Sequence, residues 1–532
     1  MKKYIALLLL VATGLTSCSD FLMEENKTQY SQDYVFNSEE GLALATTALY
    51  ALHRTYLSDD ESCTMWALER GTDIVMTNGG TGNFYGTYDP NHLKPSATQV
   101  RKMWNTMYQI IGRCNEIIAA GKDLEQTDAL KTTLAEAKAF RAQSYFLLFR
   151  TYDRIWLNTE PVTWENVNDP RDYHPAEPNK VYELLYSDLT YAIENLDWQS
   201  AQPGRFNQAA ARAILAKVAL WKKDWQTALD QADAFENSGY ALLSEPVEVF
   251  KGADLNHSEA LMVQQWSENP GGNFSTTTPK GHNFSTLFIA MSRNIIGGEA
   301  ADACSVENWG YTYGRCLPNP YLLSLYDQAK DKRFNDWFIH RYKNTTNREI
   351  EYGTDSNGNK LFVKPGEYFP ATKSGNVDRY NLPGCTKHGD VETRELFASR
   401  GYKDFILYRL ADVYLMGAEA ALRLNNQTKA KYYFNKTWTR AGNAEFTGTL
   451  KLQHIIDEEA REMCFENDRW YFLKRLGLLI DQVKAHAGND GYATSLAGRT
   501  NLPANPHFVR WPIPETEIIN MGAENFPQNV GY

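Results

Sequence analysis

The sequence predicts a mainly α-helical protein, built as a scaffold of tetratricopeptide-like helix pairs with an irregular loop-rich region and minor β-hairpins. Apolar residues recur at helical spacing through most of the first half and again towards the C-terminus. Small residues recur on those sides of neighbouring predicted helices that would face each other. Between about residues 240 and 400, by contrast, the chain is rich in Gly, Asn, Thr and Pro and has weak periodicity.

The helices are predicted from this spacing in chain order. The first begins after Ser38, a typical N-cap residue, and carries its apolar stripe at Leu42, Ala45, Leu49, Leu52 and Tyr56. Further helices are predicted over 103–118, 134–152 and 181–196, and two tight helix hairpins over 209–235 and 405–439. The strict repeat signature of about 34 residues is absent, so the pairs would be degenerate repeats. The small residues on their facing sides are Ala213, Ala216, Ala228, Ala232, Ala411, Ala418 and Ala420.

The whole chain divides into five segments. We expect a signal peptide at 1–17, a lipidated tether at 18–37, and an N-terminal helical part at 38–240. A loop-rich ligand-binding part at 241–400 and a C-terminal helix pair with a closing segment at 401–532 follow, interwoven with the scaffold. Within the loop-rich part, alternating apolar residues on both sides of Asn357-Gly358 predict a small β-hairpin.

The N-terminal residues have the pattern of a targeting segment. Two lysines precede a short apolar run, which is too short to span a bilayer but typical of a signal peptide. Leu15-Thr16-Ser17-Cys18 then resembles the bacterial lipobox, in which cleavage leaves Cys18 as a lipid-modified N-terminus. No later stretch has about 18 uninterrupted apolar residues, so acyl chains are the only evident anchor.

Composition and motifs narrow the function classes. The net charge is −11 with a pI of about 5.5, which argues against a duplex nucleic-acid binder. The sequence contains no HExxH, GxSxG or Walker motif and no metal-spaced Cys/His cluster, so no catalytic residue, metal or cofactor is expected. Carboxylates are plentiful, however, and folding alone could bring two together, so a glycoside hydrolase stays open as an alternative. The acidic cluster at 457–468 alternates with Arg and Lys and is interpreted as ion pairing on helix surfaces and between helices.

The aromatic residues give the clearest indication of function. The chain has 13 Trp, 31 Tyr and 24 Phe. A sugar ring has an apolar face and a fringe of hydroxyls, so its binding site needs a flat aromatic side chain beside polar ones. Two loop clusters have that composition, and the alternative use for their aromatics is to cap the scaffold or to contact a transporter. The candidate ligand-binding residues are Trp66, Arg70, Asp73, Asn83, Tyr85 and Tyr88 in the first cluster, and Trp309, Tyr311 and Tyr313 in the second.

The second cluster has two further features. Its three aromatics alternate with Gly310, Thr312 and Gly314, so in an extended loop they would face the same way as one platform. Cys304 and Cys316 bracket the loop, and a disulfide between them would be compatible with a compartment outside the cytoplasm.

Several segments also resemble a known family. In chain order they are AEAKAFRAQSYFLLFRTYDRIWL (135–157), GRFNQAAARAILAKVALWKKDWQTALDQAD (204–233), LPNPYLLSLYDQAKDKRF (317–334), KDFILYRLADVYLMGAEAAL (403–422) and DEEAREMCFENDRWYFLKRLG (457–477). Together with the lipobox and the C-terminal segment, they resemble the SusD/RagB-like outer-membrane nutrient-binding lipoproteins along nearly the whole chain. The stretch 280–310 matches poorly, and it is there that the family's ligand loops vary.

The resemblance implies a non-catalytic lipoprotein, lipid-anchored in the outer membrane at the surface of a Gram-negative bacterium. Such a protein binds glycans (oligosaccharides) and delivers them to a TonB-dependent, SusC-like barrel transporter, its expected partner. Three alternatives remain open from the sequence: a peptide-binding member of the same family, an extracytoplasmic glycoside hydrolase, and a scaffold that binds only other proteins.

Overall fold

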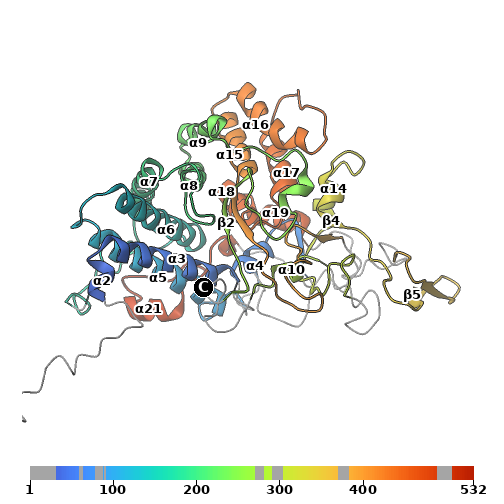
Figure 1. The fold of residues 1–532 in the computed structure, drawn as a ribbon, viewed down its shortest axis with the longest axis horizontal. Helices are drawn as coiled ribbons and strands as arrows, with labels where there is room; N and C mark the ends of the chain where they lie inside the picture. The colour runs from blue at the N-terminus through green and yellow to red at the C-terminus, as the bar shows by residue number, and fades with distance from the viewer. Residues whose placement is uncertain are drawn as a thin grey trace, which may run out of the picture.

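The structure is a computed structural model that describes residues 32–58, 64–77, 88, 92–163, 165–269, 281–289, 304–369, 383–487 and 506–532. It is mainly α-helical, as predicted, with short strands between the helices (Figure 1). Among the helices it describes, none is both long and apolar enough to cross a bilayer.

The first half is a series of long helices. They are α2 (Gln32–Phe36), α3 (Glu39–Ser58), α5 (Thr98–Ala120), α6 (Asp128–Tyr152), α7 (Pro178–Asn195), α8 (Gln208–Lys222) and α9 (Trp225–Asp233). Ser38 caps α3 as predicted, because its hydroxyl accepts the Gly41 amide at 3.1 Å. The predicted helix over 134–152 begins earlier, at Asp128, where the Thr127 side chain accepts the Leu130 amide.

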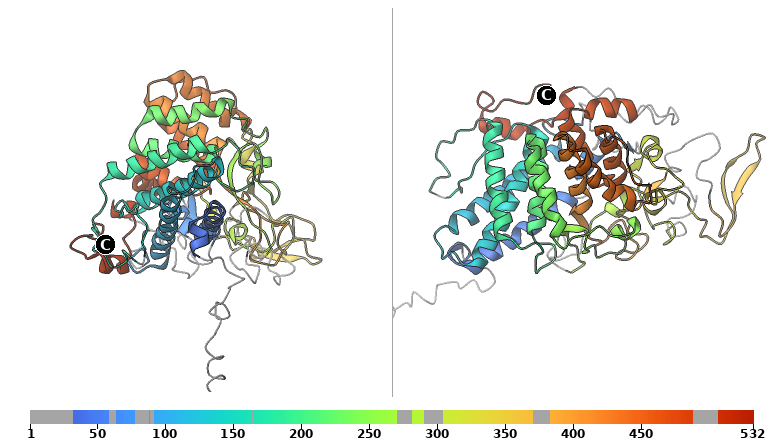
Figure 2. Two further views of the ribbon diagram at one scale, coloured as in Figure 1. Left: turned by 60° about the vertical axis from the view of Figure 1, so that its left-hand side comes forward. Right: turned by 90° about the horizontal axis from the view of Figure 1, so that it is seen from above.

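The two predicted helix hairpins form and pack on each other. α8 and α9 make one, and α15 (Leu410–Arg423) with α16 (Gln427–Arg440) makes the other. Each helix from α5 to α9 contacts the next, and α9 contacts α15, which gives one continuous stack (Figure 2). The small residues are buried between the helices, as expected. Gly417 fits only as glycine, because a Cβ there would lie 2.8 Å from the Cβ of Ala232.

One boundary of the predicted hairpins is wrong. Residues 405–409 do not continue α15 but form strand β8 (Phe405–Arg409), which pairs antiparallel with β2 (Ala260–Gln264). The apolar spacing that predicted helix also suits a buried strand, and the partner strand lies about 145 residues away in the sequence, so no local pattern could decide.

Short strands and helices fill the rest of the fold. The remaining strands pair as β1 (Val75–Thr77) with β3 (Cys316–Pro318), β4 (Phe338–Ile339) with β7 (Gly384–Cys385), and β5 (Ile350–Thr354) with β6 (Lys360–Val363). The last pair is the predicted hairpin, and it projects from the body (Figure 1). The short helices are α4 (Thr64–Glu69), η3 (Ala234–Asn237), η4 (Pro246–Phe250), α10 (Phe284–Leu287), α13 (Pro320–Ser324) and α14 (Arg333–Asp336).

The C-terminal part returns to the N-terminal helices. It contains α17 (Leu452–Met463), α18 (Arg469–Leu476), α19 (Leu479–His486), η5 (Pro506–Val509) and α21 (Glu515–Met521). The Trp511 amide donates to the carbonyl of Thr151 at 2.9 Å, and the Asn529 side chain donates to the carbonyl of Tyr152 at 2.7 Å. The closing segment therefore completes the packing around α6.

The acidic cluster forms ion pairs, as predicted, but they lie in the interior rather than on the surface. Arg409 contacts Glu259 at 2.9 Å, Glu462 at 2.7 Å and Glu466 at 2.6 Å, and all four side chains are buried. Arg333 likewise contacts Glu458 and Glu462. A buried charge is tolerated only beside an opposite charge and hydrogen bonds, so these residues fix how α17 sits against the loop-rich part.

Candidate ligand-binding site

A two-stranded sheet joins the two stretches of chain that carry the predicted clusters. In the antiparallel β1–β3 pair, Thr77 lies opposite Cys316 and Val75 opposite Pro318. Trp66, Arg70 and Asp73 of the first cluster precede β1 in the chain, and the second cluster directly precedes β3. Two segments more than 200 residues apart in the sequence therefore meet at one edge.

Residues 304–316, the aromatic loop, are held on the scaffold by their backbone. The amide of Tyr311 donates to the carbonyl of Leu396 at 2.5 Å, and that of Tyr313 donates to the carbonyl of Thr286 at 2.6 Å. The side chains of Tyr311 and Tyr313 are half-buried, while Thr312 between them is buried. From Tyr311 onward, the side chains of the loop thus alternate between half-buried and buried, so the two tyrosines remain accessible to a ligand.

The two tyrosines form a corner rather than a flat surface. Their ring centroids are 5.2 Å apart at an interplanar angle of 86°. The guanidinium of Arg315 lies 5.5 Å from the centre of the Tyr313 ring and adds a fixed hydrogen-bond donor beside the aromatics. An apolar face next to a donor is the arrangement that a sugar ring needs.

Trp309 does not extend this platform, so the predicted continuous surface of three aromatics is wrong. Its φ is +62° and that of Gly310 is +66°, so the chain turns there instead of running extended. The indole lies directly on Gly389, where a Cβ would come within 2.3 Å of the ring, and it packs against a small hydrophobic cluster. Arg394 fixes the turn by donating to the carbonyls of Trp309 at 2.7 Å and Tyr311 at 2.9 Å.

Phe397 is an exposed aromatic residue near this loop that the sequence pattern does not single out. Its side chain is 62% exposed, and it follows Leu396, whose carbonyl accepts the Tyr311 amide. The only sequence signal is a lone aromatic in a polar stretch. Nothing local places that stretch against the aromatic loop.

Two residues of the first cluster belong to the core, and their predicted role in ligand binding is corrected. Asp73 is fully buried and pairs with Arg469 through two contacts of 2.9 and 2.7 Å. Tyr88 is buried too, with its hydroxyl on the Gly71 carbonyl and its ring 5.8 Å from that of Phe508. Burial raises the pKa of the Tyr88 phenol.

The remaining members of the first cluster are Trp66, Arg70, Asn83 and Tyr85. Arg70 is half-buried in the turn after α4. Trp66 lies within α4. Asn83 and Tyr85 lie outside the described residues, so their assignment as ligand-binding residues stays a prediction.

No disulfide joins Cys304 and Cys316, both of which lie in the described part of the chain. Cys316 is buried in β3, while Cys304 is half-buried at the start of the loop. Arg394 and the backbone hydrogen bonds to residues 286, 287 and 396 close the loop instead.

A surface groove of about 770 Å³ opens beside the stretch that carries Arg394 and Phe397. We call it the acidic groove, since four carboxylates line it together with Arg54, Gln265, Trp266, Thr393 and Tyr402. The carboxylate of Asp404 accepts the Trp266 amide at 3.0 Å, and burial raises its pKa to about 6. Among the described residues, no group of His, Cys, Asp and Glu is arranged to hold a metal ion.

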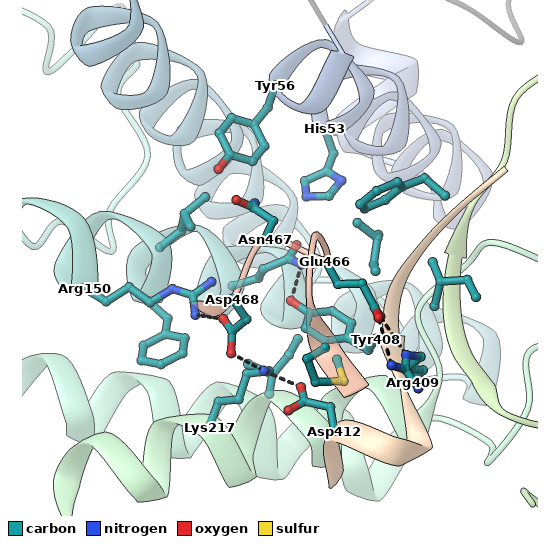
Figure 3. Close-up of a pocket in the computed structure, with 18 of the residues that line it drawn as sticks. His53, Tyr56, Arg150, Lys217, Tyr408, Arg409, Asp412, Glu466, Asn467 and Asp468 are labelled. Carbon is teal, nitrogen blue, oxygen red and sulfur yellow. Dashed lines mark hydrogen bonds and ion pairs between the residues drawn. The ribbon is translucent and has the colours of Figure 1, made fainter. Parts of the chain in front are cut away.

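A second polar cavity lies inside the molecule, where α3, α6, α8, β8 and the α17–α18 connection meet (Figure 3). Lys217 bridges Asp412 at 2.5 Å and Asp468 at 2.6 Å, and Arg150 holds Asp468 at 2.9 Å. Burial raises the pKa of Asp412. For Asp468, burial opposes a lower pKa, but Lys217 and Arg150 outweigh it and lower that pKa.

Two carboxylates with pKa values shifted in opposite directions are a feature of glycoside hydrolases, but this pair is structural. Lys217 occupies the position between them in which a substrate would have to lie. The cavity has about 80 Å³ of space, which is room for a handful of water molecules.

Comparison with known proteins agrees with this fold. A family profile described as "SusD family" matches residues 260–532, and one described as "Starch-binding associating with outer membrane" matches residues 20–220. A SusD-like protein of Bacteroides ovatus is 27% identical over 506 residues, which cover 88% of this chain and 82% of that protein.

Solved structures share the architecture. A laminarin-binding SusD-like protein has a TM-score of 0.67 at 23% identity, covering 93% of this chain and all of its own. Surface glycan-binding protein A from Bacteroides thetaiotaomicron, in complex with laminarihexaose, has a TM-score of 0.67 at 17% identity, covering 92% of this chain and 99% of its own. With a family profile matched over more than half of its length, the chain belongs to the SusD family.

Proposed function

We propose that the protein is a non-catalytic glycan-binding lipoprotein, which captures oligosaccharides at the aromatic loop. The observation that carries the proposal is the corner of Tyr311 and Tyr313, which lies next to β3 in the chain. The exposed Phe397 follows Leu396, whose carbonyl accepts the Tyr311 amide. The ligands of the two structural relatives, laminarin and laminarihexaose, support the same ligand class.

The chemistry of the neighbouring groups fits a saccharide. Arg315 and the carboxylates of the acidic groove can hydrogen-bond hydroxyls, while the aromatic faces cover the apolar side of a ring. The groove's volume of about 770 Å³ has room for several sugar units, which suits an oligosaccharide better than a single sugar.

Membership of the family supports two further parts of the proposal. The protein is anchored in the outer membrane through lipid on Cys18, at the cell surface of a Gram-negative bacterium. There it delivers its ligand to a TonB-dependent, SusC-like transporter, which should be recovered with it when native membranes are solubilised.

The test is calorimetric titration of laminarihexaose into the wild type and into the variant Tyr311→Ala/Tyr313→Ala. Aromatic stacking contributes about 1–3 kcal/mol, so affinity should fall by about 5- to 150-fold. Tyr432→Ala is the matched control, since Tyr432 is an exposed tyrosine on α16 at 44% exposure. Equal affinity in all three proteins would remove the aromatic loop from the site.

The same sample distinguishes the alternatives. Release of reducing ends from laminarin during long incubation would indicate a hydrolase. Binding of peptides, but of no neutral glycan, would indicate a peptide-binding member of the family.

A further inference from the structure

A cavity lined by aromatic side chains lies away from the aromatic loop, between α5, the stretch 153–176 and α21. Its volume is about 480 Å³, which is within the range of ligand pockets. Four aromatic side chains line it: Trp104 and Tyr108 from α5, and Trp156 and Tyr173 from the following stretch. No residue of the aromatic loop or of the acidic groove contributes to it. In Figure 1, α21 lies at the lower left of the molecule, while α10, which contacts the aromatic loop, lies at the lower right.

The aromatic rings are held in place before any ligand binds. The hydroxyl of Tyr108 accepts the Trp156 amide at 2.9 Å and donates to the Trp156 carbonyl at 2.8 Å. The indole N–H of Trp156 donates to the carbonyl of Asp172 at 3.0 Å. The rings of Trp156 and Tyr173 are 5.0 Å apart at 53°, so they form a fixed, half-exposed corner. A preformed site loses little conformational entropy on binding.

The polar lining is made mostly of amides. Asn105 and Gln109 are exposed one turn apart on α5, and Asn520 is exposed on α21. Within the described part of the chain, the side-chain amides of these three residues make no hydrogen bond. The carboxylate of Glu517 accepts the Thr516 hydroxyl at 3.3 Å. Among the described residues that line the cavity there is no Lys, Arg or His, which disfavours phosphates, sulfated sugars and acidic sugars.

From this lining, we infer that the cavity is a second saccharide-binding site, specific for neutral sugars. Each amide can both donate to and accept from a hydroxyl, and the two ring faces offer apolar surfaces. A cationic peptide fits the lining less well, because Glu517 is the only carboxylate among the described residues that line the cavity. This inference rests on the proposed function in one respect: it takes from it that the ligand is a saccharide. Two sites on one chain would bind a long polysaccharide more tightly than either site alone.

The two sites can be observed separately by fluorine NMR of the full chain, labelled with 5-fluorotryptophan, in a detergent that has no sugar headgroup. Trp156→Phe and Trp309→Phe identify the two reporter resonances, one in the cavity and one in the aromatic loop, two residues before the Tyr311–Tyr313 corner. Titration with laminarihexaose, cellohexaose and maltohexaose is expected to shift the Trp156 signal with at least one of them, saturating below about 1 mM sugar.

A variant that fills the cavity tests the assignment without disturbing the core. Gln109→Arg places a long cation at an exposed position over the aromatic corner, where it removes an amide. It should weaken the Trp156 response by about tenfold or more, since one hydrogen bond is worth about that factor. Gln226→Arg, the same change at an exposed position on α9, is the control and should leave the response intact.

Each outcome decides between the two proposals. A shift of Trp309 without one of Trp156 overturns the second site and leaves the proposed function standing. A shift of Trp156 alone supports the second site and argues against the aromatic loop. No shift of Trp156 with any of the three sugars overturns the inference. A parallel titration with trilysine, a cationic peptide, overturns it too if trilysine alone shifts the Trp156 signal.

Discussion

Asp73 and Tyr311 both belong to loop clusters with the composition of a sugar site, but the structure gives them opposite roles. Asp73 is buried and paired with Arg469, whereas Tyr311 remains half-exposed on a loop held by its backbone. A carboxylate in the interior requires an opposite charge, so a suitable partner elsewhere in the chain decides whether it faces ligand or core.

Replacing Asp73 should therefore affect stability and not binding. Asp73→Ala leaves the buried guanidinium of Arg469 with one carboxylate fewer, which should lower the free energy of unfolding by about 3–5 kcal/mol in urea denaturation. Glycan affinity of the folded protein should be unchanged. Lys180→Ala, which breaks the exposed pair with Glu183, should cost less than about 1 kcal/mol. Lower affinity at full stability would return Asp73 to the binding site.

Buried histidines predict how stability depends on pH. Burial lowers the pKa of His282 and of His388 to about 4, against about 6.5 in the unfolded chain. Between these values the unfolded chain binds more protons than the folded one. The free energy of unfolding should therefore fall as the pH drops from about 6.5 towards 4, by about 1.4 kcal/mol per pH unit for each histidine.

The variant His388→Gln tests the sign directly. Glutamine can keep the hydrogen bond to the Phe465 carbonyl, which lies 2.7 Å from the His388 ring nitrogen. Urea denaturation between pH 4.5 and 6.5 should show a slope smaller by one proton than in the wild type. An equal slope in both proteins would show that His388 binds its proton equally well in the folded and unfolded states.

At the scale of the elements, the stack depends on small residues between helices. Ala216 on α8 and Ala418 on α15 are fully buried, and Gly417 lies against Ala232 of α9. Close-packed interiors have no space for added methyl groups, so alanine is needed where two helices approach closely.

Enlarging one of these residues should loosen the stack. Ala216→Leu adds three carbons to a filled interface and should destabilise the protein by about 1–3 kcal/mol, seen as a lower midpoint in thermal denaturation. Ala51→Leu on the exposed face of α3 is the control and should change stability by less than about 0.5 kcal/mol. Equal midpoints for both variants would mean that the α8 interface is not closely packed.

At the scale of the whole molecule, segments distant in the sequence complete each other. The β1–β3 and β2–β8 pairs join the N-terminal half to later segments, and the closing segment packs on α6. The large hydrophobic cluster includes Trp511 and Phe526 from that segment, and both are fully buried. The halves of the chain therefore share one core.

Removal of residues 506–532 should consequently prevent folding of the N-terminal helices as well. Each large buried side chain contributes about 1.5–3 kcal/mol, and the segment supplies several, against a typical total stability of 5–15 kcal/mol. The truncated chain should show no cooperative thermal transition by circular dichroism. Val530→Ser, at a position 74% exposed in the same segment, should melt like the wild type. A wild-type transition in the truncated chain would show that the N-terminal helices fold alone.

The sequence by itself determined the local elements of this protein and its family. Helical spacing, small residues at i and i+3 or i+4, and the Asn357-Gly358 turn are patterns within a few residues of each other, so they predict helix pairs and a hairpin correctly. The tertiary structure decided the site. Strand β8 exists because β2 lies beside it, Asp73 is buried because Arg469 reaches it, and Phe397 joins the aromatic loop because the Leu396 carbonyl binds Tyr311. These pairings join residues dozens to hundreds of positions apart, and the free energy that selects them comes from burial and charge compensation in the folded interior, which no local pattern contains.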